Sequence, residues 1–129
     1  MKKLLSLIAA FAALFALTPV AAAPPWTNYT DMSFARAQSA GKTILVDVHA
    51  AWCPTCKAQQ PILNELRADS RLKDVVFFKV DFDSDKSFLR ANNIPRQSTI
   101  VVFQGKKETA RSIAETNRKR LRGVVLSAI

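Results

Sequence analysis

Residues 46–57 read Val46-Asp47-Val48-His49-Ala50-Ala51-Trp52-Cys53-Pro54-Thr55-Cys56-Lys57, and this stretch decides how the rest of the chain is interpreted. It holds both cysteines of the 129-residue chain and its one histidine. The β-branched run 43–48, interrupted only by Asp47, predicts a buried strand, and the residues from Pro54 onward predict a helix. Cys53 therefore falls at a strand-to-helix junction.

This junction favours a reactive thiol. Pro54 suits the first helical position, where its missing N–H is not needed, so Cys53 becomes the N-cap. The free N–H groups of the first turn and the helix dipole then stabilise a thiolate, an arrangement that lowers thiol pKa values to roughly 3.5–7.5. Cys56 follows on the same helix face, near the Cα separation of about 5.5 Å that a disulfide needs. We predict Cys53 as nucleophile and Cys56 as resolving thiol.

Two other interpretations of the cysteine pair are weaker. Zinc needs four ligands, and His49 cannot complete the set because the chain has no second Cys or His pair. A structural disulfide between residues so close in sequence removes little entropy from the unfolded chain and therefore adds little stability. The pair therefore favours redox exchange over a metal site.

Residues 1–23 have the organisation of a secretory signal peptide. A charged n-region, an apolar h-region and a small-residue cleavage region follow one another at Met1–Lys3, Leu4–Leu17 and Thr18–Ala23. We expect cleavage after Ala22 rather than Ala23, which would leave Pro24 directly behind the cut, and one domain over residues 24–129. The alternative is an uncleaved membrane anchor, since Leu4–Ala23 just reaches the ~20 residues that a span needs.

The chain is strongly basic, with a net charge of +9 at pH 7. Such a balance is typical of proteins that meet nucleic acid, an anionic membrane surface or acidic proteins. The basic residues are scattered except for Arg118-Lys119-Arg120 with Arg122, and no aromatic residue interleaves with that cluster. We expect a solvated helix face there and no nucleic-acid partner. With three glycines in all, the chain has no phosphate-binding loop.

The remaining pattern predicts an α/β fold. Helices are expected at Met32–Ala40, from Pro54 to Ser70–Asp74, at Asp83–Asn93 and after Thr116 or Asn117, and strands at Thr43–Ala50, Val75–Val80, Thr99–Phe103 and Glu108–Ile113. Met32, Ala35 and secondarily Phe34 are expected to face inward, and Trp26 is favoured as a core residue. Pro61 either kinks the second helix or separates it from a new helix. The order predicts a central mixed sheet flanked by helices on both faces.

In this order and spacing the motifs resemble the thioredoxin family over essentially all of residues 24–129. The likeness is carried by Ile44–Asp47, Trp52–Lys57, Pro61, Phe78–Asp81 and Thr99–Phe103. It implies a thioredoxin fold and disulfide exchange through a mixed disulfide on Cys53 that Cys56 resolves. The signal-like segment and the Cys-Pro-Thr-Cys site make the chain similar to exported thioredoxins and to periplasmic thioredoxin-like domains of thiol:disulfide interchange proteins.

The resemblance also implies roles for Asp47 and Lys79. In the family the matching carboxylate is buried behind the resolving cysteine and pairs with the matching lysine. Cys56 must lose a proton in an apolar pocket, and a desolvated Asp47 with a raised pKa can accept it, directly or through water. The alternatives are a structural Asp47 and a Lys79 that only neutralises it. His49 points the same way as Asp47 and is either a charge switch or a partly exposed packing residue.

Protein substrates are expected to contact six residues on either side of the disulfide, namely Trp52, Pro54, Thr55, Gln97, Ser98 and Thr99. Here the chain departs from the family, which carries a cis-proline where this chain has Ser98. A cis bond before Ser98 would cost roughly 2.5–4 kcal/mol, so strand-like docking of substrate is expected to differ. Because the family's proline helps to keep metals off the cysteines, iron–sulfur or copper capture by a dimer is left open.

The sequence thus predicts an exported, periplasmic thiol–disulfide oxidoreductase that acts without a cofactor, as a protein disulfide reductase or electron carrier. By resemblance, a membrane thiol-transfer protein supplies the electrons, and apocytochromes c or oxidised envelope thiols receive them. The alternatives are a weak oxidase or isomerase of envelope disulfides, and a non-catalytic or copper-binding module that uses Cys53, Cys56 and His49. The direction depends on a reduction potential that the sequence does not give.

Overall fold

The computed structural model of the chain describes residues 15–129, so the charged start and most of the apolar part of the predicted signal peptide lie outside the described residues. Residues 15–25 are irregular and largely exposed, and regular structure begins at Trp26. From residue 15 onward, none of the helices combines the length and apolar character that a membrane span requires. The signal peptide and its cleavage remain predictions.

The centre of the molecule is a five-stranded sheet in the order β1-β3-β2-β4-β5. The strands are β1 Trp26–Asn28, β2 Thr43–His49, β3 Val76–Asp81, β4 Thr99–Gln104 and β5 Lys107–Ile113. β3 pairs in parallel with both β1 and β2, whereas β4 runs antiparallel to β2 and β5. This confirms the predicted mixed sheet, with β2, the strand before the cysteines, at its centre.

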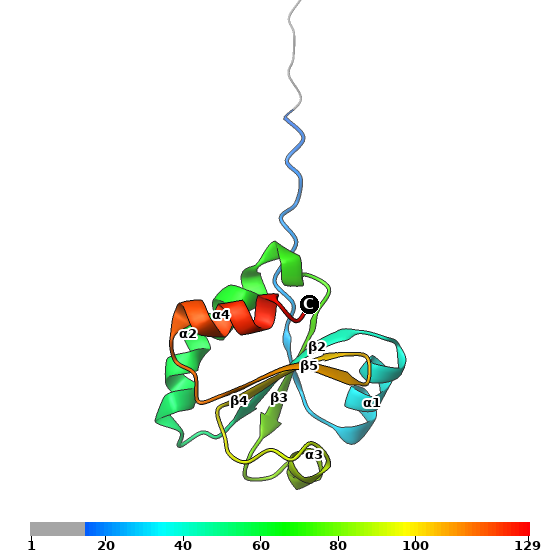
Figure 1. Ribbon diagram of the computed structural model, residues 1–129. Helices are drawn as coiled ribbons and strands as arrows, with labels where there is room; N and C mark the ends of the chain where they lie inside the picture. Colours follow the sequence, from blue (N-terminus) through cyan, green and yellow to red (C-terminus); the bar gives the residue numbers. More distant parts are fainter. Residues whose placement is uncertain (1–14) are drawn as a thin grey trace, which may run out of the picture.

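Helices cover both faces of the sheet, as predicted. They are α1 Asp31–Ser39, α2 Pro54–Ala68, α3 Lys86–Ala91 and α4 Arg118–Leu126, with a 3₁₀ turn η1 at Ser70–Leu72. Figure 1 shows α2 and α4 together on one side of the sheet and α1 and α3 on the other. One apolar layer is formed by Leu45, Leu63, Phe77, Ile100 and Leu121 among others, and the other by Phe34, Val46, Phe78, Phe88 and Val101 among others.

The first strand, β1, is absent from the sequence prediction. It has only three residues and directly follows Pro24-Pro25, so it offers no alternation to detect. Trp26, which was expected in the core, is half-buried at its edge, where its ring packs edge-on against Phe77 with centroids 5.5 Å apart. β1 therefore extends the parallel part of the sheet and closes the edge beside β3.

The inward face of α1 differs from the prediction. Met32 is 64% exposed and Ala35 is exposed, while Phe34 is buried. The Phe34 ring lies 5.4 Å from the ring of Phe88 and 5.4 Å from that of Phe103, between centroids. An aromatic ring buries more apolar area than the methyl group of alanine, so Phe34 sets the rotation of the helix.

Helix α2 runs without interruption across Pro61, so the alternative of a boundary with a new helix at Ile62 is wrong. Pro61 is exposed, and on the solvent side of a helix the carbonyl that loses its donor can bond water instead. The helix buries Ile62, Leu63 and Leu66, as its apolar spacing predicts. Both cysteine positions are therefore fixed to one long, well-packed helix.

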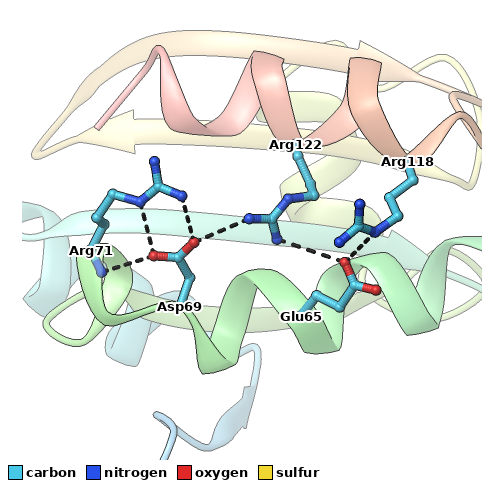
Figure 2. Close-up of polar contacts among 5 residues, drawn as sticks. All are labelled: Glu65, Asp69, Arg71, Arg118 and Arg122. Carbon is cyan, nitrogen blue, oxygen red and sulfur yellow. Dashed lines mark hydrogen bonds and ion pairs between the residues drawn. The ribbon is translucent and has the colours of Figure 1, made fainter.

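Ion pairs hold α4 over the C-terminal half of α2 (Figure 2). Arg118 Nε lies 2.6 Å from Glu65 Oε2, and Arg122 Nη2 lies 3.1 Å from Asp69 Oδ2. Arg71 also binds Asp69, and its hydrogen bonds hold the pKa of that carboxyl well below the ordinary range. The basic cluster of α4 is thus partly matched by acidic residues of this chain, as suits a solvated helix face.

Candidate redox site at the start of helix α2

The two cysteines are joined in a disulfide, with their Cα atoms 5.3 Å apart. Cys53 is the N-cap of α2, with Pro54 at the first helical position, as predicted. The backbone N–H of Cys56 donates to Cys53 Sγ at 3.0 Å. A sulfur in this position meets the positive end of the helix dipole and accepts from an N–H that has no partner within the helix, and both effects favour a thiolate after reduction.

The disulfide is enclosed on its inner side. Cys53 and Cys56 are buried with Ala50, and the ring of Phe82 packs against this cluster. The neighbouring Trp52 is 57% exposed, and its indole Nε1 donates to Asp83 Oδ2 at 2.8 Å. Trp52 thus presents a tethered aromatic surface next to Cys53 in the chain, and its contact with protein substrates stays a prediction.

Asp47 is fully buried on β2, on the face covered by α2. Burial raises the pKa of its carboxyl, while the hydrogen bond from Gln60 and the positive charges of His49 and Lys79 act in the opposite direction. Gln60 Nε2 donates to Oδ2 at 3.0 Å, and the other oxygen, Oδ1, has no hydrogen-bond partner within the protein. A buried carboxylate with one open oxygen is equipped to take up a proton.

Lys79 lies next to Asp47 in register across β2 and β3, but the two side chains form no direct ion pair. The direct pairing that the resemblance implied is therefore wrong. Lys79 Nζ donates instead to Gln60 Oε1 at 3.3 Å and lies 5.2 Å from the centre of the Trp26 ring. The Gln60 amide fits between acid and base because it carries a donor and an acceptor.

The loop that precedes β4, where the resemblance implied a cis-proline, has a different geometry in this chain. Residues 15–129 contain no cis peptide bond, and Ser98 has a φ of +59°, in the left-handed region. Its N–H donates to the Val48 carbonyl at 2.7 Å and its carbonyl accepts from the Ala114 N–H at 2.9 Å. Ser98 is thereby fixed to β2, the strand that leads to the cysteines.

The other predicted substrate contacts differ in accessibility. Pro54 is exposed and Thr55 and Gln97 are half-buried, whereas Ser98 and Thr99 are fully buried. The Thr99 hydroxyl donates to the Arg96 carbonyl at 2.8 Å. Direct contact with a protein substrate is therefore open to the side chains of Trp52, Pro54, Thr55 and Gln97.

The sequence did not predict a role for two glutamines at the site, Gln59 and Gln60. Gln59 is fully buried and donates from Nε2 to the carbonyls of Ser98, at 3.2 Å, and Glu115, at 3.0 Å. Gln60 joins Asp47 to Lys79, as described above. Both follow Cys56 by three or four residues, a spacing that puts them one helix turn away from it. This spacing was the signal in the sequence that could have indicated their place at the site.

A metal site is not evident in the part of the chain that the structure describes, since no three His, Cys, Asp or Glu residues gather there. His49, the third residue of the copper alternative, is half-buried, and its Nδ1 lies 3.1 Å from the Val80 carbonyl oxygen. This contact suits a packing role and keeps one ring nitrogen occupied.

A mixed sheet flanked by helices, with a disulfide between the N-cap and the first turn of α2, is the arrangement of a thiol–disulfide oxidoreductase. The family model described as Thioredoxin matches residues 26–127, and the chain belongs to the thioredoxin family. Its Cys53–Cys56 pair is the redox-active centre of a protein disulfide reductase of that family.

Individual relatives agree with this assignment. Thioredoxin H4 of Arabidopsis thaliana is 29% identical over 101 residues, which cover 78% of this chain and 80% of that protein. The bifunctional thioredoxin reductase/thioredoxin of Mycobacterium leprae is 31% identical over 71% of this chain, but the match spans only 20% of that protein. Among solved structures, Trxlp of Edwardsiella tarda EIB202 superposes with a TM-score of 0.75 at 38% identity, covering 78% of this chain and 98% of that one.

Proposed function

We propose that this chain is an exported reductant of protein disulfides in the periplasm, released by cleavage after Ala22 or Ala23. The observation that carries the redox part is the position of Cys53, whose sulfur caps α2 and accepts the Cys56 N–H. The export part is supported by the order of charged, apolar and small residues in 1–23.

The reaction begins with the reduced pair. The Cys53 thiolate attacks one sulfur of a client disulfide, forms a mixed disulfide and expels the other client sulfur as a thiolate. Cys56 then gives its proton to Asp47, and its thiolate attacks Cys53 Sγ. The Cys53–Cys56 bond forms as the bond to the client breaks and releases the second client sulfur as a thiolate. Two electrons thus pass to the client, both client thiolates take up protons from solvent, and Asp47 returns its proton to solvent.

Reduction in an oxidising compartment needs a supply of electrons. A membrane thiol-transfer protein is the donor that we propose, with apocytochromes c or oxidised envelope proteins as clients. The basic surface of the chain supports acidic docking sites on such partners.

Insulin reduction with dithiothreitol as electron source tests the enzymatic part. We expect turnover in the wild type and its loss in Cys53→Ser, whereas Ser39→Ala, at the far end of α1, serves as a matched control with full turnover. No turnover together with tight one-to-one copper binding would support the metal-binding alternative.

Equilibration with glutathione tests the direction. We expect the Cys53–Cys56 pair to have a reduction potential near that of glutathione or below it. The reason is that the negative charge of ionised Asp47 disfavours a thiolate in the reduced pair and so favours the disulfide. A potential well above glutathione would instead support the oxidase or isomerase.

Export is tested by expression of the full chain followed by fractionation. A periplasmic product whose N-terminus is Ala23 or Pro24 is expected. A product that retains Met1 and stays with the membranes after alkaline washing would support the anchor, and one in the cytosol would contradict export.

A further inference from the structure

The side chain of Gln60 lies between two charged residues, Asp47 and Lys79. It lies on α2 one helix turn after Cys56, and it contacts Asp47 on β2 and Lys79 on β3. A single amide therefore connects the helix that carries the cysteines with the two central parallel strands.

Lys79 fixes which way the Gln60 amide points. An ammonium group can only donate, so the amide oxygen Oε1 must face Lys79 Nζ, which lies 3.3 Å away. The amide nitrogen Nε2 then has to face Asp47, where it donates to Oδ2 at 3.0 Å. Asp47 consequently always meets a hydrogen-bond donor at Oδ2, and this favours its ionised form.

The two oxygens of Asp47 are thereby made unequal. Oδ2 is occupied by Gln60, whereas Oδ1 is buried and has no partner within the protein. The other polar or charged groups that act on Asp47 are His49 on the same strand and Lys79 on β3, while β4 places the apolar Ile100 opposite Asp47. None of these neighbours donates to Oδ1.

We infer that Gln60 is a positioning residue that holds Asp47 through Oδ2, so that Oδ1 is the atom that receives the Cys56 proton when the mixed disulfide is resolved. This rests on the proposed function and deepens it. The amide also separates Lys79 from Asp47, so the carboxylate keeps enough basicity to accept a proton, which a direct ion pair would reduce.

The resolving step is measured separately from the first attack with Ellman's reagent. The reduced protein releases one thionitrobenzoate when Cys53 forms the mixed disulfide and a second when Cys56 attacks Cys53. Stopped-flow traces between pH 5 and 9 give a pH profile for each phase. The first phase tests the reactivity of Cys53 and therefore the proposed function, whereas the second phase tests the role of Gln60.

Gln60→Met keeps the size of the side chain but removes the donor. Without this donor the pKa of Asp47 rises, so we expect the midpoint of the second-phase pH profile to move up by about one unit or more. On the acid side this makes the second release about tenfold slower, while the first phase is unchanged. Gln60→Glu, which sets a like charge beside Asp47, is expected to move the midpoint in the same direction. It also provides the test if Gln60→Met does not fold.

Asn64→Ala is the matched control, because Asn64 is an exposed amide one turn further along α2. Its two phases are expected to superpose on those of the wild type. Second-phase profiles of Gln60→Met and Gln60→Glu that also superpose on the wild type would overturn the inference. Loss of the first phase in the wild type would contradict the proposed function itself.

Discussion

Gln59 donates from Nε2 to the carbonyl oxygen of Ser98 at 3.2 Å and so links α2 to the loop that precedes β4. The same nitrogen reaches the Glu115 carbonyl at 3.0 Å, so one buried side chain fixes two loops at the site. Ser98 and Glu115 both lie outside the helices and strands, and the Gln59 contact adds to the backbone bonds that Ser98 makes with Val48 and Ala114.

Gln59→Leu tests that contact. The substitution keeps the volume but removes the donor to the Glu115 carbonyl, while the Ser98 carbonyl keeps its bond from the Ala114 N–H, so we expect the free energy of unfolding to fall by about 1 kcal/mol. Urea unfolding measures the change, with Asn64→Ala as the exposed-amide control. Equal stability of Gln59→Leu and the wild type would show that the loops are held by other contacts.

Ser98 allows a test of backbone conformation. Its φ of +59° disfavours any side chain, so Ser98→Gly is expected to raise the free energy of unfolding by about 1 kcal/mol. Ser98→Pro should lower it by about 3 kcal/mol, because proline cannot adopt this φ and would lose the bond to the Val48 carbonyl. Thermal unfolding of both variants provides the measurement, and a stabilising proline would contradict the described loop geometry.

Asp47 gives the chain a specific dependence of stability on pH. Its pKa is raised in the folded state by burial, so between the ordinary carboxyl pKa of about 3.9 and the raised value the folded chain holds a proton that the unfolded chain has released. Stability contributed by this group is complete below that window and is lost as the pH rises through it.

Asp47→Asn removes this loss. We expect the variant to gain stability over the wild type as the pH rises from 4 to 8, while its resolving step becomes slower. Urea unfolding at several pH values measures the first effect. A stability difference that stays constant with pH would show that the Asp47 pKa is not raised.

Substitutions of Trp52 and Trp26 are expected to affect different properties, because Trp52 is exposed and Trp26 packs against the core. Trp52 is 57% exposed, so Trp52→Ala is expected to change the free energy of unfolding by only about 0.5 kcal/mol while lowering kcat/KM for insulin more than for a small disulfide. Trp26 packs on Phe77, and Trp26→Ala is expected to cost at least about 2 kcal/mol. Equal loss of activity toward both substrates in Trp52→Ala would argue against a docking role.

The sequence predicts what depends on local pattern. The strand before Cys53, the helix after Pro54 and their junction follow from a β-branched run and from a proline at the first helical position, and all are confirmed. β1 could not be predicted because a three-residue strand is stabilised by its neighbour β3 and has no periodicity of its own. The predicted rotation of α1 was wrong because burial of the large Phe34 ring turns Met32 and Ala35 toward solvent.

At the site, residue types were predictable but contacts between distant elements were not. Asp47 and Lys79 are both beside the cysteine helix, yet their link through Gln60 depends on the register of β2 and β3 and on the rotation of α2. The conformation of Ser98 likewise depends on its bond to Val48, 50 residues earlier in the chain. A single sequence contains no direct record of such pairings.

Disulfide exchange by this protein depends on a Cys53 thiolate that the start of α2 stabilises. The most direct measurement is the pH dependence of iodoacetamide alkylation of the reduced Cys56→Ser protein, which leaves Cys53 as its one thiol. We predict rapid alkylation with a midpoint below pH 7.5, at least about one unit under the value of roughly 8.5 for free cysteine. A midpoint at or above 8.5, or a thiol that is never alkylated, would contradict the account.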